Sequence, residues 1–154
     1  MGSIATLLPV VSLERIFRTD NRARDKVLSR LLGILGEDIV RLWAAKDAAP
    51  YRDLGRPTLW LPNGEGRSTL DFTLQSRADD RVFVAEMKCE LEVENYRYLT
   101  LTNASQLAHH KGEAFRRFLS LARDPAAFVV KVSAKPIPVD GAILVWGAQQ
   151  QKAD

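Results

Sequence analysis

The sequence predicts a single α/β domain. Two segments carry apolar residues at intervals of three and four, which is the spacing of one face of an α-helix. Other segments alternate apolar and polar residues or form short apolar runs, as β-strands do. At 154 residues, of which 46% are hydrophobic, the chain is long enough for one domain with a real core and too short for two ordinary ones. We expect that core to cover about residues 20–147, and the abrupt C-terminal end leaves open that the chain is one domain of a longer protein.

The first predicted helix covers about residues 20–46. Glycines at positions 33 and 36 weaken it slightly. It ends near Pro50, because proline lacks an amide donor and disfavours helix at the preceding residue. Its apolar residues recur at three- and four-residue spacing and are Val27, Leu28, Leu31, Leu32, Leu35, Ile39, Leu42 and Trp43.

Three strands follow in the prediction. The first covers residues 58–61 and is closed by the turn signal Pro62-Asn63-Gly64. The second covers residues 69–75 and the third covers residues 82–88. A hairpin turn at residues 78–80 joins the second strand to the third.

A second helix and two more strands are predicted in the last third of the chain. The helix covers about residues 103–122 and ends near Asp124-Pro125. Short apolar strands at residues 127–132 and 142–146 follow it, and residues 135–138 are interpreted as a linker between them. The acidic stretch at residues 89–98 is compatible with either a strand extension or a loop.

Charged residues on the second and third predicted strands point toward a common site. The period-two pattern of TLDFTLQ, residues 69–75, puts Asp71 on the polar face, opposite Leu70 and Phe72. In VFVAEMK, residues 82–88, Glu86 and Lys88 share one face. The apolar start and charged end of this strand indicate that it leaves a core and opens into a site.

Asp71, fourteen intervening residues and then Glu86-Met87-Lys88 resemble the signature of the restriction-endonuclease-like PD-(D/E)xK nuclease superfamily. In that signature, an Asp near a strand end is followed across a hairpin by Glu or Asp, any residue and Lys. Leu70 stands in place of the name-giving proline, which does no chemistry. The order helix, three strands, helix and strand over about residues 20–132 is also the family's core order. The resemblance therefore implies a central mixed β-sheet flanked by helices, with a restriction-endonuclease-like core.

The resemblance further implies a metal-dependent nuclease that hydrolyses phosphodiester bonds of DNA, with Mg²⁺ or Mn²⁺ as its cofactor. Asp71 and Glu86 would hold the metal together with the Met87 carbonyl, because these ions prefer hard oxygen ligands. Lys88 would orient or help deprotonate the attacking water and stabilise the developing negative charge. A metal lowers the pKa of its bound water, so no histidine base is required.

Two blander interpretations of these residues stay open. A carboxylate and a lysine two positions apart on a strand usually form a solvated or weakly paired surface, which contributes roughly 0 to 1 kcal/mol. The fold could also persist without catalysis, in a domain that binds nucleic acid or protein. The presence of all three signature residues, Asp71, Glu86 and Lys88, favours activity.

Many members of this superfamily add an acidic residue from the first helix, and Glu37 and Asp38 are the candidates here. On a helical wheel, Asp38 flanks the stripe of Leu31, Leu35 and Leu42, whereas Glu37 lies almost opposite its centre. If this stripe faces the core, the geometry favours Asp38 for reaching a site at the core's edge. The family's usual pattern instead favours Glu37, since apolar residues follow it three and six positions later. Both remain candidate metal ligands.

The second predicted helix supplies further candidates. In exonuclease-type branches of the superfamily, a Gln followed four residues later by Tyr lies on this helix, and Gln106 with His110 resembles that pattern except at the aromatic. Gln106 is therefore a candidate for orienting Lys88 or a metal-bound water. The adjacent His109 and His110 do not predict a zinc site, because neighbouring side chains on a helix diverge by about 100°. Five basic residues are candidate phosphate contacts: Arg56, Arg67, Lys111, Arg116 and Arg117.

Charge and cysteine content restrict the partner and the compartment. A net charge of +3 and a pI near 9.2 permit a polyanionic partner without requiring one. The single cysteine, Cys89, excludes an internal disulfide, as expected in a reducing cytoplasm. No apolar run approaches the roughly 20 residues of a membrane-spanning helix. We expect a soluble cytoplasmic protein whose partner is nucleic acid, with DNA favoured, and a homodimer would supply the two active sites that paired cuts in duplex DNA often need.

Overall fold

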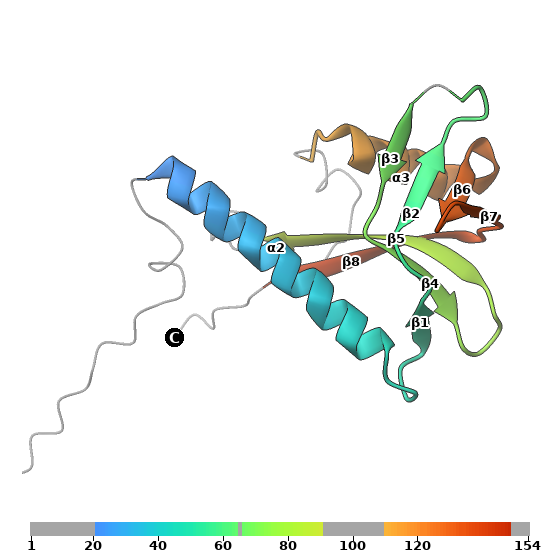
Figure 1. Cartoon of the computed structure of the whole chain (residues 1–154), viewed down its shortest axis with the longest axis horizontal. Helices are drawn as coiled ribbons and strands as arrows, with labels where there is room; N and C mark the ends of the chain where they lie inside the picture. The colour runs from blue at the N-terminus through green and yellow to red at the C-terminus, as the bar shows by residue number, and fades with distance from the viewer. Residues whose placement is uncertain (1–20, 65, 91–109, 149–154) are drawn as a thin grey trace, which may run out of the picture.

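The computed structural model describes residues 21–64, 66–90 and 110–148, which form a mixed α/β fold with two sheets (Figure 1). This confirms the predicted α/β class. In chain order the elements are α2 (Arg22–Ala44), β1 (Tyr51–Asp53), β2 (Pro57–Trp60), β3 (Arg67–Thr69), β4 (Phe72–Ser76), β5 (Val82–Glu90), α3 (Glu113–Arg123), the 3₁₀ turn η3 (Pro125–Ala127), β6 (Val129–Val132), β7 (Lys135–Ile137) and β8 (Gly141–Ala148).

The first sheet has the strand order β1-β4-β5-β8. Neighbours β1 and β4 are antiparallel, as are β4 and β5, whereas β5 and β8 are parallel. The parallel pair is long and extends from Phe83 opposite Gly141 to Glu90 opposite Ala148. Parallel neighbours need a crossover connection, and helix α3 lies within the segment that joins β5 to β8. This sheet is therefore mixed, and it carries both Glu86 and Lys88.

The second sheet has the order β3-β2-β6-β7 and is antiparallel throughout. The predicted strands at residues 58–61 and 127–132 exist as β2 and β6, but they pair with each other and not with the strand of Glu86. The first sheet instead contains β1, which was not predicted from the sequence, and β8. The alternation of residue types identifies strands but does not say which strands pair, and the strands form two sheets where the resemblance implies one central sheet.

The predicted linker at residues 135–138 is also wrong, because its first three residues form strand β7. Lys135 pairs with Val132 and Ile137 with Val130. The two residues between β6 and β7, Ser133 and Ala134, have φ angles of 49° and 67°. Positive φ at both central residues is the geometry of a tight two-residue hairpin, which is why the chain turns back here.

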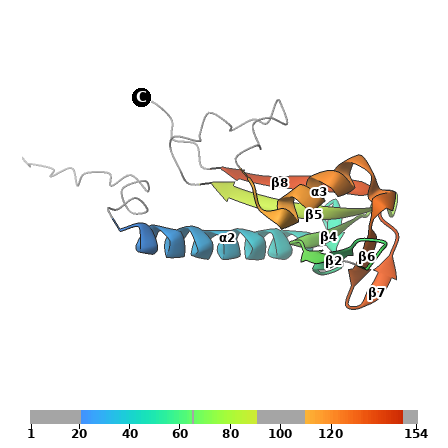
Figure 2. The same ribbon diagram turned by 90° about the horizontal axis from the view of Figure 1, so that it is seen from above.

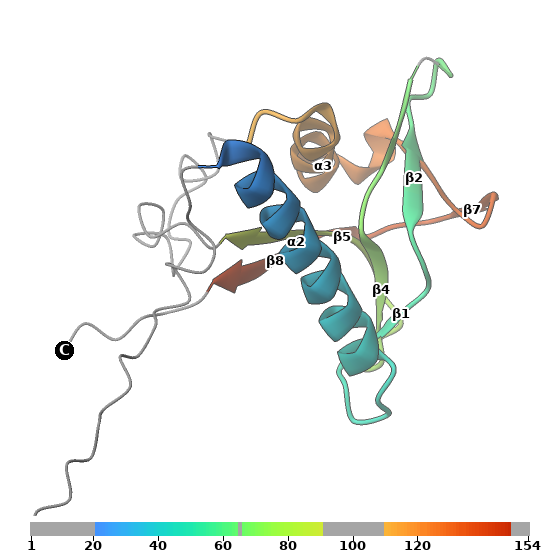
Figure 3. The same ribbon diagram turned by 60° about the vertical axis from the view of Figure 1, so that its left-hand side comes forward.

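Helices α2 and α3 cover opposite faces of the first sheet (Figure 2). Strands β5 and β8 both point away from the second sheet, which lies at the opposite end of the first sheet (Figure 3). On the α3 face, one buried cluster joins α3 to both sheets and contains Leu59, Leu70, Val84, Phe115, Phe118, Leu121 and Val130. On the α2 face, a smaller cluster is built on Phe72, Leu74 and Ala85.

Helix α2 starts at Arg22, because the side chain of Asn21 accepts hydrogen bonds from the first backbone N–H groups of the helix. It packs on the sheet through a small residue, since a Cβ on Gly36 would lie 2.6 Å from the Met87 Cε. The predicted apolar stripe points away from the sheet instead, and Leu31, Leu35 and Leu42 are between 55% and 69% exposed. The helical wheel therefore identified an apolar face correctly but assigned it wrongly to the core.

The predicted strand at residues 69–75 is interrupted at Asp71. Strand β3 ends at Thr69 in the second sheet, and β4 begins at Phe72 in the first. Leu70 packs in the cluster beside α3, whereas Phe72 packs in the cluster beside α2. Asp71 therefore lies at the bend where the chain passes from one sheet to the other.

Helix α3 confirms the second half of the second predicted helix, but residues 110–112 are described and are not helical, so His110 and Lys111 precede the helix and the predicted start is wrong. Residues 91–109, which include Gln106 and His109, lie outside the described residues. The buried face of α3 consists of Phe115, Phe118 and Leu121, at the three-residue spacing of a helix that packs on a core. No helix in the described ranges is long and apolar enough to cross a bilayer.

Candidate functional site

The Asp71 carboxylate connects the bend to strand β5. Its Oδ2 accepts a hydrogen bond of 2.8 Å from the Met87 backbone N–H, and its Oδ1 lies 3.5 Å from the Arg56 Nη2. The pairing between β4 and β5 ends at Phe72 opposite Ala85. Beyond that point, the Asp71 side chain provides Met87 with the hydrogen-bond acceptor that a neighbouring strand would otherwise supply.

Glu86 and Lys88 share the face of β5 that is covered by α3, as the strand alternation predicts. The Lys88 Nζ donates a hydrogen bond of 2.5 Å to the Glu86 Oε1. The same Nζ lies 5.1 Å from the centre of the Phe115 ring, within the range of a cation–π contact. The Glu86 side chain is only 8% exposed and that of Lys88 23%, so this ion pair is held largely away from water.

Burial raises the pKa of the Glu86 carboxyl above its ordinary value. The hydrogen bond from Lys88 lowers this pKa, while the negative charge of Asp71 and a hydrogen bond with Asp71 raise it. The hydrogen bond from the Met87 N–H puts the Asp71 carboxylate against the backbone of β5, next to Glu86 in the chain. Two neighbouring carboxylates that repel one another are an arrangement that a bound divalent cation stabilises.

The raised pKa of Glu86 predicts a pH-dependent stability. A carboxyl group whose pKa is higher in the folded chain than in the unfolded chain favours the folded state at low pH. This contribution to the free energy of unfolding is full below the unfolded pKa of about 4.3, and it is lost as the pH rises through the folded pKa. The substitution Glu86→Gln removes this titration. We therefore expect the free energy of unfolding of the wild type, relative to Glu86→Gln, to fall as the pH rises from about 4 to 7. Urea unfolding at each pH measures this difference, and parallel pH profiles for the two proteins would contradict the raised pKa.

The backbone carbonyl of Met87 adds an oxygen atom near the carboxylates of Asp71 and Glu86. In an extended strand, the N–H and C=O of one residue point to the same side. Because the Met87 N–H points at Asp71, its carbonyl also lies on the Asp71 side of β5. In residues 21–64, 66–90 and 110–148, no three His, Cys, Asp or Glu side chains come together as a ligand group. A cation here would therefore take Asp71, Glu86, the Met87 carbonyl and water as ligands, a set that fits a hard ion such as Mg²⁺.

Of the two candidate acids on α2, Glu37 lies on the side of Arg56 and Asp71, and Asp38 does not. The Glu37 Oε2 lies 3.9 Å from the Arg56 Nη2, which is the same nitrogen that reaches Asp71. The Glu37 side chain is 22% exposed, whereas that of Asp38 is 60% exposed. The wheel-based preference for Asp38 fails because the leucine stripe used as its reference points away from the sheet.

Arg56 is the candidate phosphate contact that the structure places against Asp71. Its side chain is 55% exposed, and its Nε also lies 3.5 Å from the Leu70 carbonyl. Of the other four candidates, Arg67 lies over the ring of Trp60, Arg117 pairs with Glu113, and Lys111 and Arg116 are exposed.

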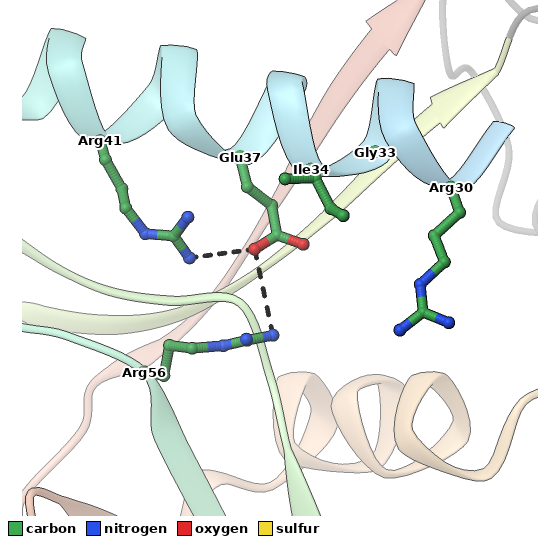
Figure 4. Close-up of a pocket in the computed structure, with 6 residues that line it drawn as sticks. All are labelled: Arg30, Gly33, Ile34, Glu37, Arg41 and Arg56. Carbon is green, nitrogen blue, oxygen red and sulfur yellow. Dashed lines mark hydrogen bonds and ion pairs between the residues drawn. The ribbon is translucent and has the colours of Figure 1, made fainter. Parts of the chain in front are cut away.

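A pocket of about 680 Å³ adjoins Arg56 on the side of α2 (Figure 4). It is lined by Arg30, Gly33, Ile34, Glu37, Arg41 and Arg56. Arg30 and Arg41 were not among the site residues predicted from the sequence. The available signal is their spacing, since Arg30, Glu37 and Arg41 stand at positions i, i+7 and i+11 and therefore share one helix face.

The fold thus brings Asp71, Glu86 and Lys88 together, with Met87 beside them and Glu37 and Arg56 at the rim. Comparison of the chain with protein-family models, with curated proteins and with solved structures finds no match. A proposed function therefore depends on the contacts and charges of the described residues alone.

Proposed function

We propose that the chain is a metal-dependent nuclease of the restriction-endonuclease-like type that hydrolyses phosphodiester bonds of DNA. The observation that supports this most is that Asp71 contacts the backbone of β5 between Glu86 and Lys88. Its Oδ2 accepts a hydrogen bond of 2.8 Å from the Met87 N–H, and the Lys88 Nζ lies 2.5 Å from the Glu86 Oε1. A bound Mg²⁺ or Mn²⁺ would polarise the phosphoryl oxygen and lower the pKa of the attacking water.

Each residue of the site has a distinct role in the proposal. Asp71 from the bend and Glu86 from β5 supply hard oxygen ligands from two directions, and the Met87 carbonyl supplies a third. Lys88 orients the attacking water and stabilises the negative charge that develops on the phosphate. Partial burial of Lys88 between Glu86 and Phe115 strengthens this electrostatic effect, because water screens the ammonium group less.

The order of the elements supports the same proposal. Helix α2 precedes β1, β4 and β5, and α3 lies between β5 and the parallel strand β8. Taken within the first sheet, this is the order helix, three strands, helix and strand that the superfamily resemblance implies. The strands β2, β3, β6 and β7 would then be an addition to that core, and they hold the bend at Asp71 in place through β3.

The experiment that tests the proposal is cleavage of plasmid and single-stranded DNA by the purified chain with Mg²⁺ and with a chelator. We expect cleavage that requires the metal and that falls roughly 10² to 10⁴-fold in Lys88→Ala, the range for loss of one general acid–base group. Lys135→Ala, which removes an exposed lysine on β7, is the matched control and should cleave at the wild-type rate.

Equal cleavage by the wild type and Lys88→Ala would show that the activity does not come from this site. A wild type that binds DNA but never cleaves it would favour the alternative function, a domain that keeps this fold for binding alone. Circular dichroism of each variant checks that a loss of cleavage is not a loss of folding.

A further inference from the structure

The pocket beside α2 carries an excess of positive charge. Figure 4 shows Arg30 and Arg41 extending from one face of α2 and Arg56 extending toward them from the connection between β1 and β2. Glu37 lies between them and is the single carboxylate among the described residues that line the pocket. Three guanidinium groups against one carboxylate make this pocket suited to an anion.

The three arginines are held to different degrees. Arg41 is fixed, because its two terminal nitrogens lie 3.0 Å from Glu37 and 3.1 Å from Asp38, and its guanidinium lies 5.2 Å from the centre of the Phe72 ring. Arg56 is more exposed and its ion pairs are longer, at 3.5 and 3.9 Å. Arg30 is exposed and forms no ion pair within the described residues. Arg30 and Arg56 therefore have donors that a ligand can take at little cost.

We propose that this pocket binds a backbone phosphate of the nucleic acid, one that neighbours the phosphate cleaved at Asp71 and Glu86. The inference rests on the proposed nuclease function and names the residues that would position its substrate. Guanidinium groups match the oxygens of a phosphate in two-pronged contacts, which lysine cannot make. The pocket volume of about 680 Å³ lies within the range of small-ligand sites, so it admits the sugar attached to that phosphate as well.

Arg56 fixes where this phosphate lies relative to the carboxylates. Its Nη2 lies 3.5 Å from the Asp71 Oδ1, and Arg56 is also one of the residues that line the pocket. A strand that passes from the pocket to the carboxylates would therefore keep one guanidinium beside two consecutive phosphates. Arg41 and Glu37 hold the rear of the pocket rigid, since both belong to the same ion-pair network on α2.

The test is the binding of fluorescein-labelled DNA, followed by fluorescence anisotropy in a chelator at several salt concentrations, so that neither metal nor cleavage contributes. We expect Arg30→Gln to weaken binding several-fold and to reduce the salt slope by about 1, the value of one lost phosphate contact. Arg30→Lys should restore the salt slope but not the full affinity, because lysine keeps the charge without the two-pronged geometry. Arg30 is suited to this test because no described ion pair depends on it.

Arg123→Gln is the matched control, since it removes an exposed arginine from the last turn of α3. It should leave the affinity close to that of the wild type. An equal loss of DNA affinity in Arg30→Gln and Arg123→Gln would mean that DNA binding depends only on the overall charge of the protein. That result would contradict a phosphate site in the pocket. Unchanged binding by Arg30→Gln would overturn it as well.

The failure of this inference is distinguishable from the failure of the proposed function. If cleavage requires Asp71 and Lys88 but Arg30→Gln binds and cleaves like the wild type, the proposed phosphate pocket is wrong and the proposed nuclease function is supported. If DNA binding requires Arg30 but the wild type never cleaves DNA, phosphate binding in the pocket is supported and the proposed nuclease function is wrong. In an active enzyme, Arg30→Gln should raise KM more than it lowers kcat, because it removes binding and not chemistry.

Discussion

Substitution of Asp71 by Asn is expected to lower metal-dependent DNA cleavage roughly 10³-fold or more and to leave the chain folded. Asparagine keeps an oxygen that can accept the hydrogen bond from the Met87 N–H, so the contact between the bend and β5 survives. It loses the negative charge that a divalent cation requires. The contribution of a metal to transition-state stabilisation is several kcal/mol, and each ~1.4 kcal/mol corresponds to a tenfold change in rate.

A second substitution at the same position separates the two roles of Asp71. Asp71→Ala loses the acceptor as well as the charge, and it leaves the N–H of Met87 without its partner. We expect this variant to be less stable than Asp71→Asn by roughly 1 to 3 kcal/mol in urea unfolding, although cleavage should be strongly reduced in both. Asp47→Asn, which neutralises an exposed acid after α2, is the control for the loss of one charge. Wild-type cleavage by Asp71→Asn would exclude Asp71 as a metal ligand.

The largest expected effect on stability is that of Leu70→Ala. Leu70 is fully buried in the cluster that joins α3 to both sheets. Removing most of its side chain should cost about 2 to 5 kcal/mol of unfolding free energy, because the transfer energy of the lost atoms is added to that of the cavity. The cavity would also lie directly beside Asp71, so cleavage should fall along with stability.

Leu42→Ala is the matched comparison, because it makes the same chemical change on α2. The sequence predicts Leu42 to be a core residue, whereas the structure leaves it 69% exposed. We expect its effect to lie within about 0.5 kcal/mol of zero in urea unfolding. A loss for Leu42→Ala as large as that for Leu70→Ala would show that the apolar face of α2 is covered in solution. Repeating the unfolding at several protein concentrations would then tell whether a second copy covers it.

The sequence predicted most elements correctly and their pairing less well. The strand with Glu86 and the helix with Leu42 were recognisable because each repeats one pattern over many residues. The strand β1 has only three residues, too few for a pattern. The strand β7 was hidden by Pro136, which normally interrupts strands, but β7 is the edge strand of its sheet and its proline is tolerated there.

The candidate site was predictable to the extent that it depends on local alternation. Glu86 and Lys88 lie two residues apart on one strand, so their common face follows from the period of a strand. The choice between Glu37 and Asp38 depends on which side of α2 meets the sheet. Hydrophobicity gave the wrong side, because the contact is made at Gly36, where the lack of a side chain lets the helix approach Met87.

The hydrogen bond between Asp71 and Met87 has a consequence for how the folded chain behaves toward its own copies. Beyond Ala85, no described strand pairs with the β4 side of β5, and such an open edge can recruit strands from other molecules. Asp71 occupies the N–H of Met87 there, and Glu86 and Lys88 add charge beside the same edge. The groups proposed for catalysis would therefore also hinder edge-to-edge aggregation, and they would do so whether or not the chain cleaves DNA.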